Sequence, residues 1–413
     1  MYDVKRIARL FDERQPGYSL PQALYTDPEV FEFDLQAIFY RNWTQVGFEA
    51  ELPHAGSYLA TTIGRAPVVV VRDRRGDIHA FHNVCRHRGA QICKNGAGRV
   101  PRLMCPYHQW SYDLDGKLLA ARGSDSDFDV ATHGLRAVRL ELVAGCIYVA
   151  LSEDPPDFAP FRRVVEAALG PYNLRNLKVA HVAELPEAAN WKLVMENGRE
   201  CHHCEARHPE LKNAFPVEAA EGEAFFKREA ASPFTKRMEA LGLMTTEQLG
   251  DWWQIGRYPL KSGYLSFSMD GKPLVAKPLS STNDGNLGTM RWATEPSEFS
   301  HVSSDSVFTF RVNPVSPLTT VVIARWLVHK DAVEGQDYEV DRLIHMWNET
   351  NFQDRDLAEN NQRGVSSIGY VPGPYSASFE PYVRRFVDWY CQQSKLVLGG
   401  GTGRAESVSR LRA

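Results

Sequence analysis

Two short stretches decide how the first part of this chain folds: Phe81-His-Asn-Val-Cys-Arg-His-Arg-Gly89 and Cys105-Pro-Tyr-His-Gln-Trp110. Each contributes one cysteine and one histidine, and 17 residues separate His87 from Cys105. A zinc finger would place its two histidines together, after both cysteines. One cysteine and one histidine in each stretch instead fit a [2Fe–2S] centre with two thiolates on one iron and two imidazoles on the other.

The residues around these stretches have the pattern of a small all-β domain. The apolar runs Val68–Val71 and Ile78–Val84 flank a polar turn, which predicts a hairpin. A second hairpin is predicted around Asp115-Gly116, because this dipeptide favours tight turns. The break at Asp154-Pro-Pro-Asp157 predicts the end of the domain, which we therefore place at residues 42–155.

A second group of metal-ligand residues lies in Glu200-Cys-His-His203-Cys-Glu-Ala-Arg-His208-Pro209. Residues 190–206 are predicted to be helical, so Glu200 and His203 share one helix face. His208 is five positions from His203, about 140° around an ideal helix. The following proline ends the helix, so His208 can turn back towards His203. Two neutral imidazoles and a carboxylate would form the facial triad of non-haem Fe(II) enzymes, which leaves positions for dioxygen and substrate.

A predicted helix at 353–363 offers two aspartates as the carboxylate. Asp354 shares a partly apolar helix face with Leu357, whereas Asp356 shares a solvated face with Glu359. We therefore predict that Asp354 is the third ligand.

Cys201 and Cys204 have the spacing of a thiol redox pair or of half a zinc site. The sequence has no unclaimed second half for such a zinc site, so we expect both cysteines to be packing residues. The total of seven cysteines, an odd number, also argues against a disulfide framework.

Charge and composition exclude several classes of protein. The formal net charge of −4 gives no reason to expect binding to nucleic acid or to an anionic membrane. Apolar runs are far shorter than the ~18–20 residues of a membrane span. The first residues lack the basic-then-apolar layout of a secretory signal. We expect a soluble, cytoplasmic protein with two or three domains.

With both motifs placed, the chain resembles the large subunit of Rieske non-haem iron oxygenases over nearly its whole length. It is most similar to the branch that acts on glycine betaine, stachydrine and carnitine. Further matching stretches are Glu196-Asn197, Trp326–Gly335 and Val371–Tyr375. The resemblance implies an α+β protein with a helical lead-in at 1–41 that packs on the catalytic domain. An all-β Rieske domain at 42–155 and a helix-grip (START-like) catalytic domain at 156–413 would follow.

The resemblance also implies roles for the candidate ligands. The cluster would be held by Cys85, His87, Cys105 and His108, and the mononuclear iron by His203, His208 and Asp354. Glu200 matches the acidic residue that bridges the two centres between neighbouring subunits of a homotrimer. Electrons from NAD(P)H would arrive through a separate flavin–iron-sulfur reductase. A separate reductase that binds NAD(P)H fits the sequence. The glycine-rich stretch at 399–404 lacks the flanking strand and helix of a dinucleotide site.

The implied reaction is hydroxylation of an N-methyl group by dioxygen, followed by demethylation with release of formaldehyde. One alternative is a Rieske oxygenase that hydroxylates another small molecule, aromatic or aliphatic. Another is a pure electron carrier, which would not need the residues after 155.

Three residues are expected in the substrate pocket: His202, Phe299 and His301. His202 stands where the betaine branch usually has tyrosine, and a tryptophan common near Phe299 in that branch is missing. Aromatic rings attract a trimethylammonium group, at about 0.5–2 kcal/mol per ring. Candidates for such a cage are Trp252, Trp253, Tyr258, Trp292 and Phe299.

Overall fold

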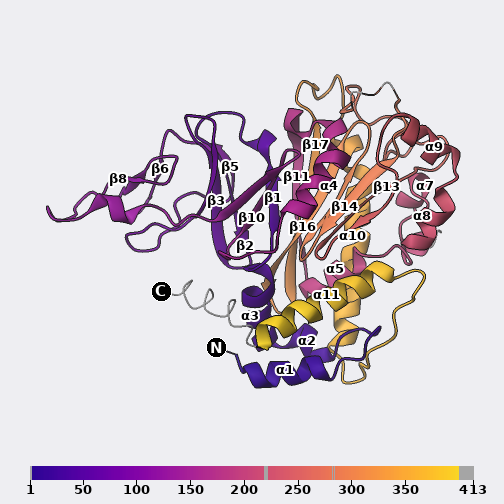
Figure 1. The fold of residues 1–413 in the computed structure, drawn as a ribbon, viewed down its shortest axis with the longest axis horizontal. Helices are drawn as coiled ribbons and strands as arrows, with labels where there is room; N and C mark the ends of the chain where they lie inside the picture. Colours follow the sequence, from indigo (N-terminus) through magenta and orange to yellow (C-terminus); the bar gives the residue numbers. More distant parts are fainter. Residues whose placement is uncertain (1, 218–221, 281, 283, 400–413) are drawn as a thin grey trace.

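The computed structural model describes residues 2–217, 222–280, 282 and 284–399. A narrow body of small sheets forms one end of the molecule, and a large sheet with its helices forms the rest (Figure 1). The α+β class is therefore as predicted. After Gly399, the glycine-rich stretch lies outside the described residues. No helix in the described part of the chain has the length and apolarity needed to cross a membrane.

The N-terminal body contains three small antiparallel sheets. They are β1 (Thr44–Phe48), β10 (Cys146–Ala150) and β9 (Arg139–Val143); β4 (Ile78–His82), β3 (Ala66–Arg72), β2 (Ser57–Ile63) and β5 (Gly96–Arg99); and β6 (Leu103–Met104), β7 (Ser111–Tyr112) and β8 (Leu118–Ala120). Both predicted hairpins are confirmed, because β3 pairs with β4 and β7 pairs with β8. The second turn requires glycine: Gly116 has a φ of 84°, and a Cβ there would lie 2.5 Å from the Phe81 ring.

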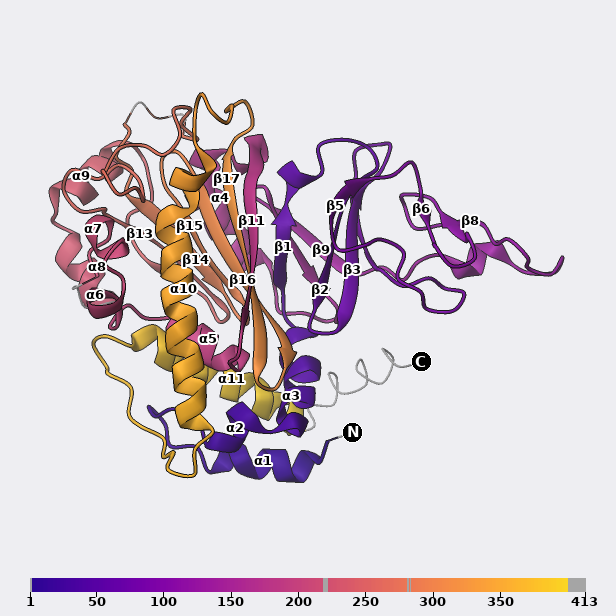
Figure 2. The same cartoon turned by 180° about the vertical axis from the view of Figure 1, so that it is seen from behind.

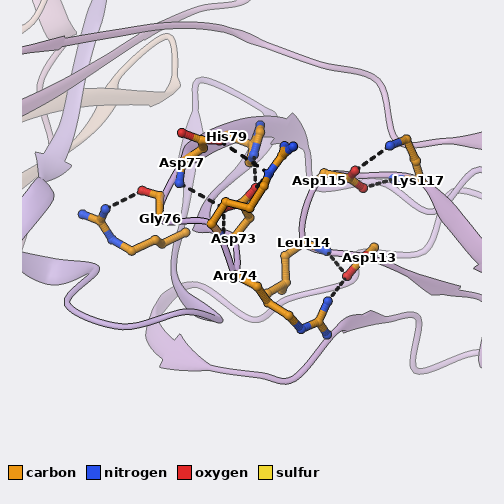
Figure 3. A network of polar contacts seen from close by, with 11 residues as sticks. Asp73, Arg74, Gly76, Asp77, His79, Asp113, Leu114, Asp115 and Lys117 are labelled. Atoms are coloured by element: carbon orange, nitrogen blue, oxygen red, sulfur yellow. Dashed lines mark hydrogen bonds and ion pairs between the residues drawn. The ribbon is translucent and has the colours of Figure 1, made fainter.

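A network of polar contacts ties the β3–β4 turn to the residue after β7 (Figure 3). Arg74 Nη1 donates to Asp113 Oδ1 at 2.5 Å. Inside the turn, Asp73 accepts from two backbone amides, and its Oδ2 lies 3.1 Å from His79 Nε2. Although burial opposes ionisation, these hydrogen bonds lower the pKa of Asp73 to about 2. The network holds together the hairpins that carry the two Cys–His loops.

A seven-stranded antiparallel sheet forms the C-terminal part. In order, its strands are β11 (Leu177–Glu187), β17 (Thr319–His329), β16 (Val307–Ser316), β15 (Glu298–Val302), β14 (Thr289–Thr294), β13 (Trp253–Tyr258) and β12 (Gln248–Leu249). The long helix α10 (Val340–Val365) crosses one face of this sheet, and it contains the helix predicted at 353–363 (Figure 2). A long helix held against a curved antiparallel sheet is the helix-grip arrangement that the resemblance implied.

The other helices surround this sheet. They are α4 (Ala159–Leu169), α5 (Trp191–Asn197), α6 (Cys204–Arg207), α7 (Leu211–Ala214), α8 (Glu223–Glu229), α9 (Pro233–Ala240) and α11 (Pro381–Leu398). Single-turn helices are η2 (Glu49–Glu51), η3 (Val130–His133), η4 (Gly170–Tyr172) and η5 (Leu174–Asn176).

The first residues fold as a helical lead-in. Its elements are α1 (Val4–Asp12), α2 (Gln22–Thr26), α3 (Pro28–Asp34) and η1 (Leu35–Phe39). Asp34 is fully buried, and it accepts hydrogen bonds from Trp191 Nε1 at 3.0 Å and from Tyr390 Oη at 2.8 Å. It also pairs with Lys192. Because these partners lie on α5 and α11, the lead-in is anchored to the C-terminal part.

Buried hydrogen bonds join the N-terminal body to the large sheet. Arg311 Nη2 in β16 donates to Thr61 Oγ1 in β2 at 2.7 Å. Tyr148 Oη in β10 donates to Glu298 Oε2 in β15 at 2.7 Å. A polar group buried without such a partner would destabilise the fold, so these bonds fix how the two parts meet.

Candidate metal centres and active site

The loops after β4 and β6 bring the first four candidate ligands together. Both loops close with the same backbone hydrogen bond. The N–H of Gly89 donates to the carbonyl of Cys85, and the N–H of Gln109 donates to the carbonyl of Cys105. The two buried thiols are adjacent, and burial together with the Cys85 thiol raises the pKa of Cys105. The His87 and His108 rings lie nearer the surface, with centroids 4.7 Å apart.

Two properties of this site fit a [2Fe–2S] cluster. His108 Nδ1 is buried and has no hydrogen-bond partner, so this nitrogen is available as a ligand. Burial, assisted by the charges of His87 and Arg88, lowers the pKa of His108 and favours the neutral imidazole that binds metal. Two deep thiols and two outer imidazoles provide the mixed ligand set of such a cluster.

The second group of predicted ligands converges beside α10. His203 Nε2 lies 3.0 Å from His208 Nε2 and 3.1 Å from Asp354 Oδ1. His208 Nε2 lies 3.0 Å from the same carboxylate oxygen. Three donor atoms at nearly equal separations surround one point, as a facial triad requires. Asp356, the alternative carboxylate, is exposed and contacts Arg355 instead.

Neighbouring side chains fix the orientation of both imidazoles. His203 Nδ1 lies 2.5 Å from Glu200 Oε1, and His208 Nδ1 lies 2.7 Å from Gln353 Oε1. Because each Nδ1–H donates to one of these oxygens, both Nε2 atoms keep their lone pairs for a metal. Sequence reasoning missed Gln353; its position directly before Asp354 was the available signal.

The predicted helix at 190–206 is wrong, because it is interrupted between α5 and α6. The Glu200 carboxylate accepts hydrogen bonds from the backbone N–H groups of His202 and His203. It therefore competes with the backbone carbonyls that would accept these N–H groups in a helix. Glu200 and His203 therefore meet across a turn rather than along a helix face. His208 follows α6 with a φ of −115°, outside the helical region, as expected before proline.

The expectation that Cys201 and Cys204 are separate packing residues is also wrong. They form a disulfide, because the turn brings their Cα atoms to 4.9 Å, within the range that a disulfide spans. Cys204 Sγ lies 3.9 Å from His203 Nε2. Its sulfur is already bonded to Cys201 Sγ, so it cannot serve as a thiolate ligand, and Asp354 remains the third donor.

A recess in the surface reaches Glu200 and His203 from outside the sheet. Glu196, Asn197 and Tyr375 also line it. The Glu196 carboxylate accepts hydrogen bonds from Tyr25 Oη and from Tyr375 Oη, both at 2.8 Å. The sequence indicates no role for Glu196 beyond the family match.

Glu196 is expected to make stability depend on pH. Burial raises its pKa to about 7, against 4.5 for an ordinary glutamate, although the two tyrosines oppose the shift. The folded state therefore holds this proton more tightly than the unfolded state does. The resulting stabilisation is complete below pH 4.5 and is lost as the pH rises to about 7. In wild type, this group should therefore change the free energy of unfolding by about 3 kcal/mol between the two pH values, and Glu196→Gln should abolish that change.

Urea unfolding at several pH values between 4.5 and 8 would measure the effect. Glu205→Gln is the control, because Glu205 is exposed on α6. Equal pH dependence in wild type and Glu196→Gln would contradict the prediction.

A small cavity lies on the other side of the three candidate ligands, between α10 and the sheet. Two of the predicted pocket residues, Phe299 and His301, line it. His202 does not: it is exposed and stacks on Phe379, with ring centroids 4.8 Å apart. The residue that departs from the betaine pattern therefore faces away from the cavity.

The aromatic lining differs from the predicted cage. Phe299 is the one cage candidate among the described residues that line the cavity, and the other rings there are Phe215, Phe310 and Trp347. Trp292 lies on the opposite face of the sheet, where its Nε1 donates to Glu298 Oε1 at 2.7 Å. Trp252 and Trp253 line a separate surface groove. Tyr258 packs beside the cavity without lining it.

His301 is a neutral member of the lining. It is buried, its Nδ1 lies 2.9 Å from Thr289 Oγ1, and its ring is 4.8 Å from that of Trp347. Burial, together with the charge of Arg291, lowers the pKa of His301 well below that of an ordinary histidine. Arg291 also lines the cavity, and sequence reasoning missed it. The available signal was an arginine between two apolar residues of a strand.

Comparison with known protein families matches both parts of the chain. Residues 42–133 match the Rieske [2Fe-2S] domain, and residues 174–395 match the catalytic domain of the ring hydroxylating alpha subunit.

Individual proteins with similar sequences or structures agree with this result. The chain is 41% identical over 411 residues to the glycine betaine monooxygenase oxygenase subunit of Pseudomonas aeruginosa, covering 98% of this chain and 96% of the relative. It is also 41% identical over 393 residues to the subunit of the same name from Chromohalobacter salexigens, covering 93% and 87%. A crystal structure of the quaternary ammonium Rieske monooxygenase CntA superimposes with a TM-score of 0.72 at 22% identity, covering 93% of this chain and 98% of that one.

Proposed function

Because the chain belongs to the Rieske oxygenases of the ring hydroxylating alpha-subunit family, we propose that it is the oxygenase subunit of a monooxygenase that demethylates a betaine-like quaternary ammonium compound. One observation carries the proposal most strongly. The His203–His208–Asp354 ligand set borders an aromatic cavity in a chain that aligns over 98% of its length with a glycine betaine monooxygenase subunit.

Two sets of residues would hold the metal groups. Cys85, Cys105, His87 and His108 would hold the [2Fe–2S] cluster, and His203, His208 and Asp354 would hold the mononuclear iron. When bound, the cluster supplies electrons one at a time, and Fe(II) activates dioxygen.

The side chains around the proposed iron site orient its ligands and exclude water from the cavity. Glu200 and Gln353 keep the two histidines in the tautomer that binds metal. Phe299, Phe310 and Trp347 line the cavity, where aromatic rings would attract a methylated ammonium group. A trimethylammonium group held there would present an N-methyl C–H bond to the metal side of the cavity.

The proposed reaction balances for glycine betaine. The substrate, one O2, two electrons and two protons give dimethylglycine, formaldehyde and water. One oxygen atom enters an N-methyl C–H bond, and the other leaves as water. The resulting N-hydroxymethyl group loses formaldehyde as its C–N bond breaks, and the electron pair of that bond stays on nitrogen.

We also propose a homotrimer fed by a separate reductase in the cytoplasm. Within one chain, the β6–β8 end and α6 lie at opposite ends of the molecule, which favours electron transfer between subunits (Figure 2). The loop between α10 and α11 supports such an interface. It lines the recess beside Glu200 through Tyr375, and it exposes Ile368 fully and Val371 by 79%. The proposed units remain a lead-in at 1–41, a Rieske domain at 42–155 and a catalytic domain at 156–413.

Formaldehyde release tests the proposed reaction. The protein, loaded with cluster and iron, would be incubated in air with NADH, a surrogate reductase and one of several amines. The amines would include glycine betaine, proline betaine and carnitine. We expect formaldehyde in proportion to the dimethylglycine formed from glycine betaine. No formaldehyde from any amine, with both metal groups present, would favour hydroxylation of a different small molecule. Oxygen consumption alone does not decide, because a poor substrate can consume oxygen without giving product.

A further inference from the structure

The disulfide between Cys201 and Cys204 lies at the proposed iron site, and the demethylation reaction does not use it. Both cysteines line the cavity together with His203 and His208. The Cys204 sulfur lies 3.9 Å from His203 Nε2, the same nitrogen that lies 3.1 Å from Asp354 Oδ1. The disulfide therefore keeps a fourth donor atom bonded to another sulfur beside the three candidate ligands.

A free Cys204 thiolate would complete a different ligand set. The donor atoms of His203, Cys204 and His208 all lie within 4.8 Å of one another. Zinc binds cysteine sulfur at about 2.3 Å and histidine nitrogen at about 2.0–2.1 Å, so rotation of the freed Cys204 side chain would bring all three atoms within reach of one ion. Asp354 Oδ1, which lies 3.0 Å from His208 Nε2, makes four protein ligands. Four ligands form a closed tetrahedral zinc site, whereas three leave a position open.

The two sulfurs differ in their exposure, which sets the course of thiol–disulfide exchange. Cys201 is half-buried, whereas Cys204 is buried. A thiolate of a dithiol reductant would therefore attack Cys201 Sγ. The S–S bond breaks, its electron pair leaves on Cys204 Sγ, and the attacking sulfur forms a mixed disulfide with Cys201. The second thiol of the reductant then displaces Cys201, so the reductant becomes a disulfide and the protein gains two thiols.

A permanent cross-link is the other role that a disulfide serves. The two cysteines are three positions apart, so their bond closes a very short loop. Because a disulfide stabilises a fold mainly by restricting the unfolded chain, a short loop contributes least. In the cytoplasm, where we place this protein, disulfides are usually transient and catalytic or redox-sensing. Both arguments favour a switch over a structural cross-link.

We propose that Cys201 and Cys204 form a thiol switch that sets the ligands and the metal of this site. The inference rests on the proposed iron site and adds its regulation. With the disulfide formed, the site has two imidazoles and a carboxylate, the set that suits Fe(II) and leaves positions for dioxygen and substrate. After reduction by a dithiol, the Cys204 thiolate joins these ligands and favours Zn²⁺, which has no redox chemistry. Reduction therefore turns the oxygenase off.

X-ray absorption at the zinc edge tests the change of ligand. Full-length protein loaded with the cluster would be reduced with dithiothreitol, freed of it under nitrogen and then given zinc. Untreated protein would be given zinc in the same way. Because the cluster contains iron and no zinc, the cluster does not contribute to the zinc signal. We expect a zinc–sulfur distance of about 2.3 Å in the reduced protein, and only nitrogen and oxygen neighbours at about 2.0–2.2 Å in the untreated protein.

Two variants separate Cys204 from the other cysteines. Cys201→Ser leaves Cys204 free without a reductant, so it should show the zinc–sulfur distance in both samples. Cys204→Ser should show it in neither. Alkylation followed by mass spectrometry should find two more free thiols after reduction of wild type, at positions 201 and 204. The visible spectrum of the cluster checks that each variant is folded, and wild type with and without reduction decides if a variant loses that spectrum.

A competition between metals measures the consequence for turnover. Iron and zinc would be supplied together to reduced and untreated wild type. We expect reduction to raise the ratio of bound zinc to mononuclear iron and to lower formaldehyde release from glycine betaine. In Cys204→Ser, the ratio of the two metals should not depend on dithiothreitol.

The outcomes distinguish this inference from the proposed function. Zinc with only nitrogen and oxygen neighbours in reduced wild type would overturn the switch. Resistance of the pair to dithiothreitol, or free thiols at both positions in untreated protein, would do the same. In each case, iron binding and formaldehyde release by untreated wild type would leave the proposed function intact. A site that takes up neither iron nor zinc in wild type would overturn both proposals.

Discussion

Replacing His203 with alanine is expected to abolish formaldehyde release while the [2Fe–2S] spectrum stays unchanged. The substitution removes one of three donor atoms that lie 3.0–3.1 Å apart, so the remaining pair cannot hold iron firmly. Loss of a group that only orients a metal ligand typically costs 10–100-fold in affinity or activity. Loss of the ligand itself should therefore cost more than about 100-fold in turnover.

Three measurements on the purified variant check this expectation. Iron analysis should show that the mononuclear iron is missing while the cluster iron remains, visible absorption reports on the cluster, and formaldehyde reports on turnover. His345→Ala is a matched control, because His345 is exposed on α10, the helix that also carries Asp354. Turnover that survives His203→Ala would show that the metal assignment is wrong.

Replacing Glu200 with glutamine should slow turnover about 10–100-fold while both metal groups stay bound. Glu200 Oε1 lies 2.5 Å from His203 Nδ1, and the side chain borders both the cavity and the outer recess. Glutamine keeps the shape of the side chain and one acceptor oxygen. It loses the negative charge that orients His203. In the proposed trimer, the same charge couples His203 to a histidine of the neighbouring subunit's cluster.

Rapid mixing separates this role from simple support of the iron site. Protein with a reduced cluster and bound substrate would be mixed with dioxygen. The visible absorption of the cluster would then measure the rate of its oxidation. We expect slow oxidation in Glu200→Gln at normal iron occupancy. Glu205→Gln, an exposed change on α6, should oxidise at the wild-type rate. If Glu200→Gln oxidises as fast as wild type, Glu200 does not couple the centres.

Much of the two candidate metal sites follows from local sequence patterns. The Cys85–His87 and Cys105–His108 pairs are set by loops of a few residues, and both neighbouring hairpins formed as predicted. Helical periodicity distinguished Asp354 from Asp356, and the structure brings Asp354 beside His203. Local patterns were sufficient there because helix faces and tight turns depend on residues close in sequence.

Local patterns failed where a side chain competes with the backbone. The spacing of Glu200 and His203 suited a continuous helix. The helix is broken because the Glu200 carboxylate binds the backbone N–H groups that a helix would use. The same turn joins Cys201 to Cys204 in a disulfide, where the sequence predicts two packing residues.

The sequence by itself determined the family and, through it, the α+β class, and it predicted the two sets of ligand residues, because the motifs consist of residue types at fixed short spacings. Only the tertiary structure decided which side chains form the cavity. All six residues of β14 are buried, so both faces of the strand are covered, and its alternation of residue types does not tell which face α10 covers. Packing of α10 on one face places Arg291 in the cavity and leaves Trp292 on the opposite face of the sheet.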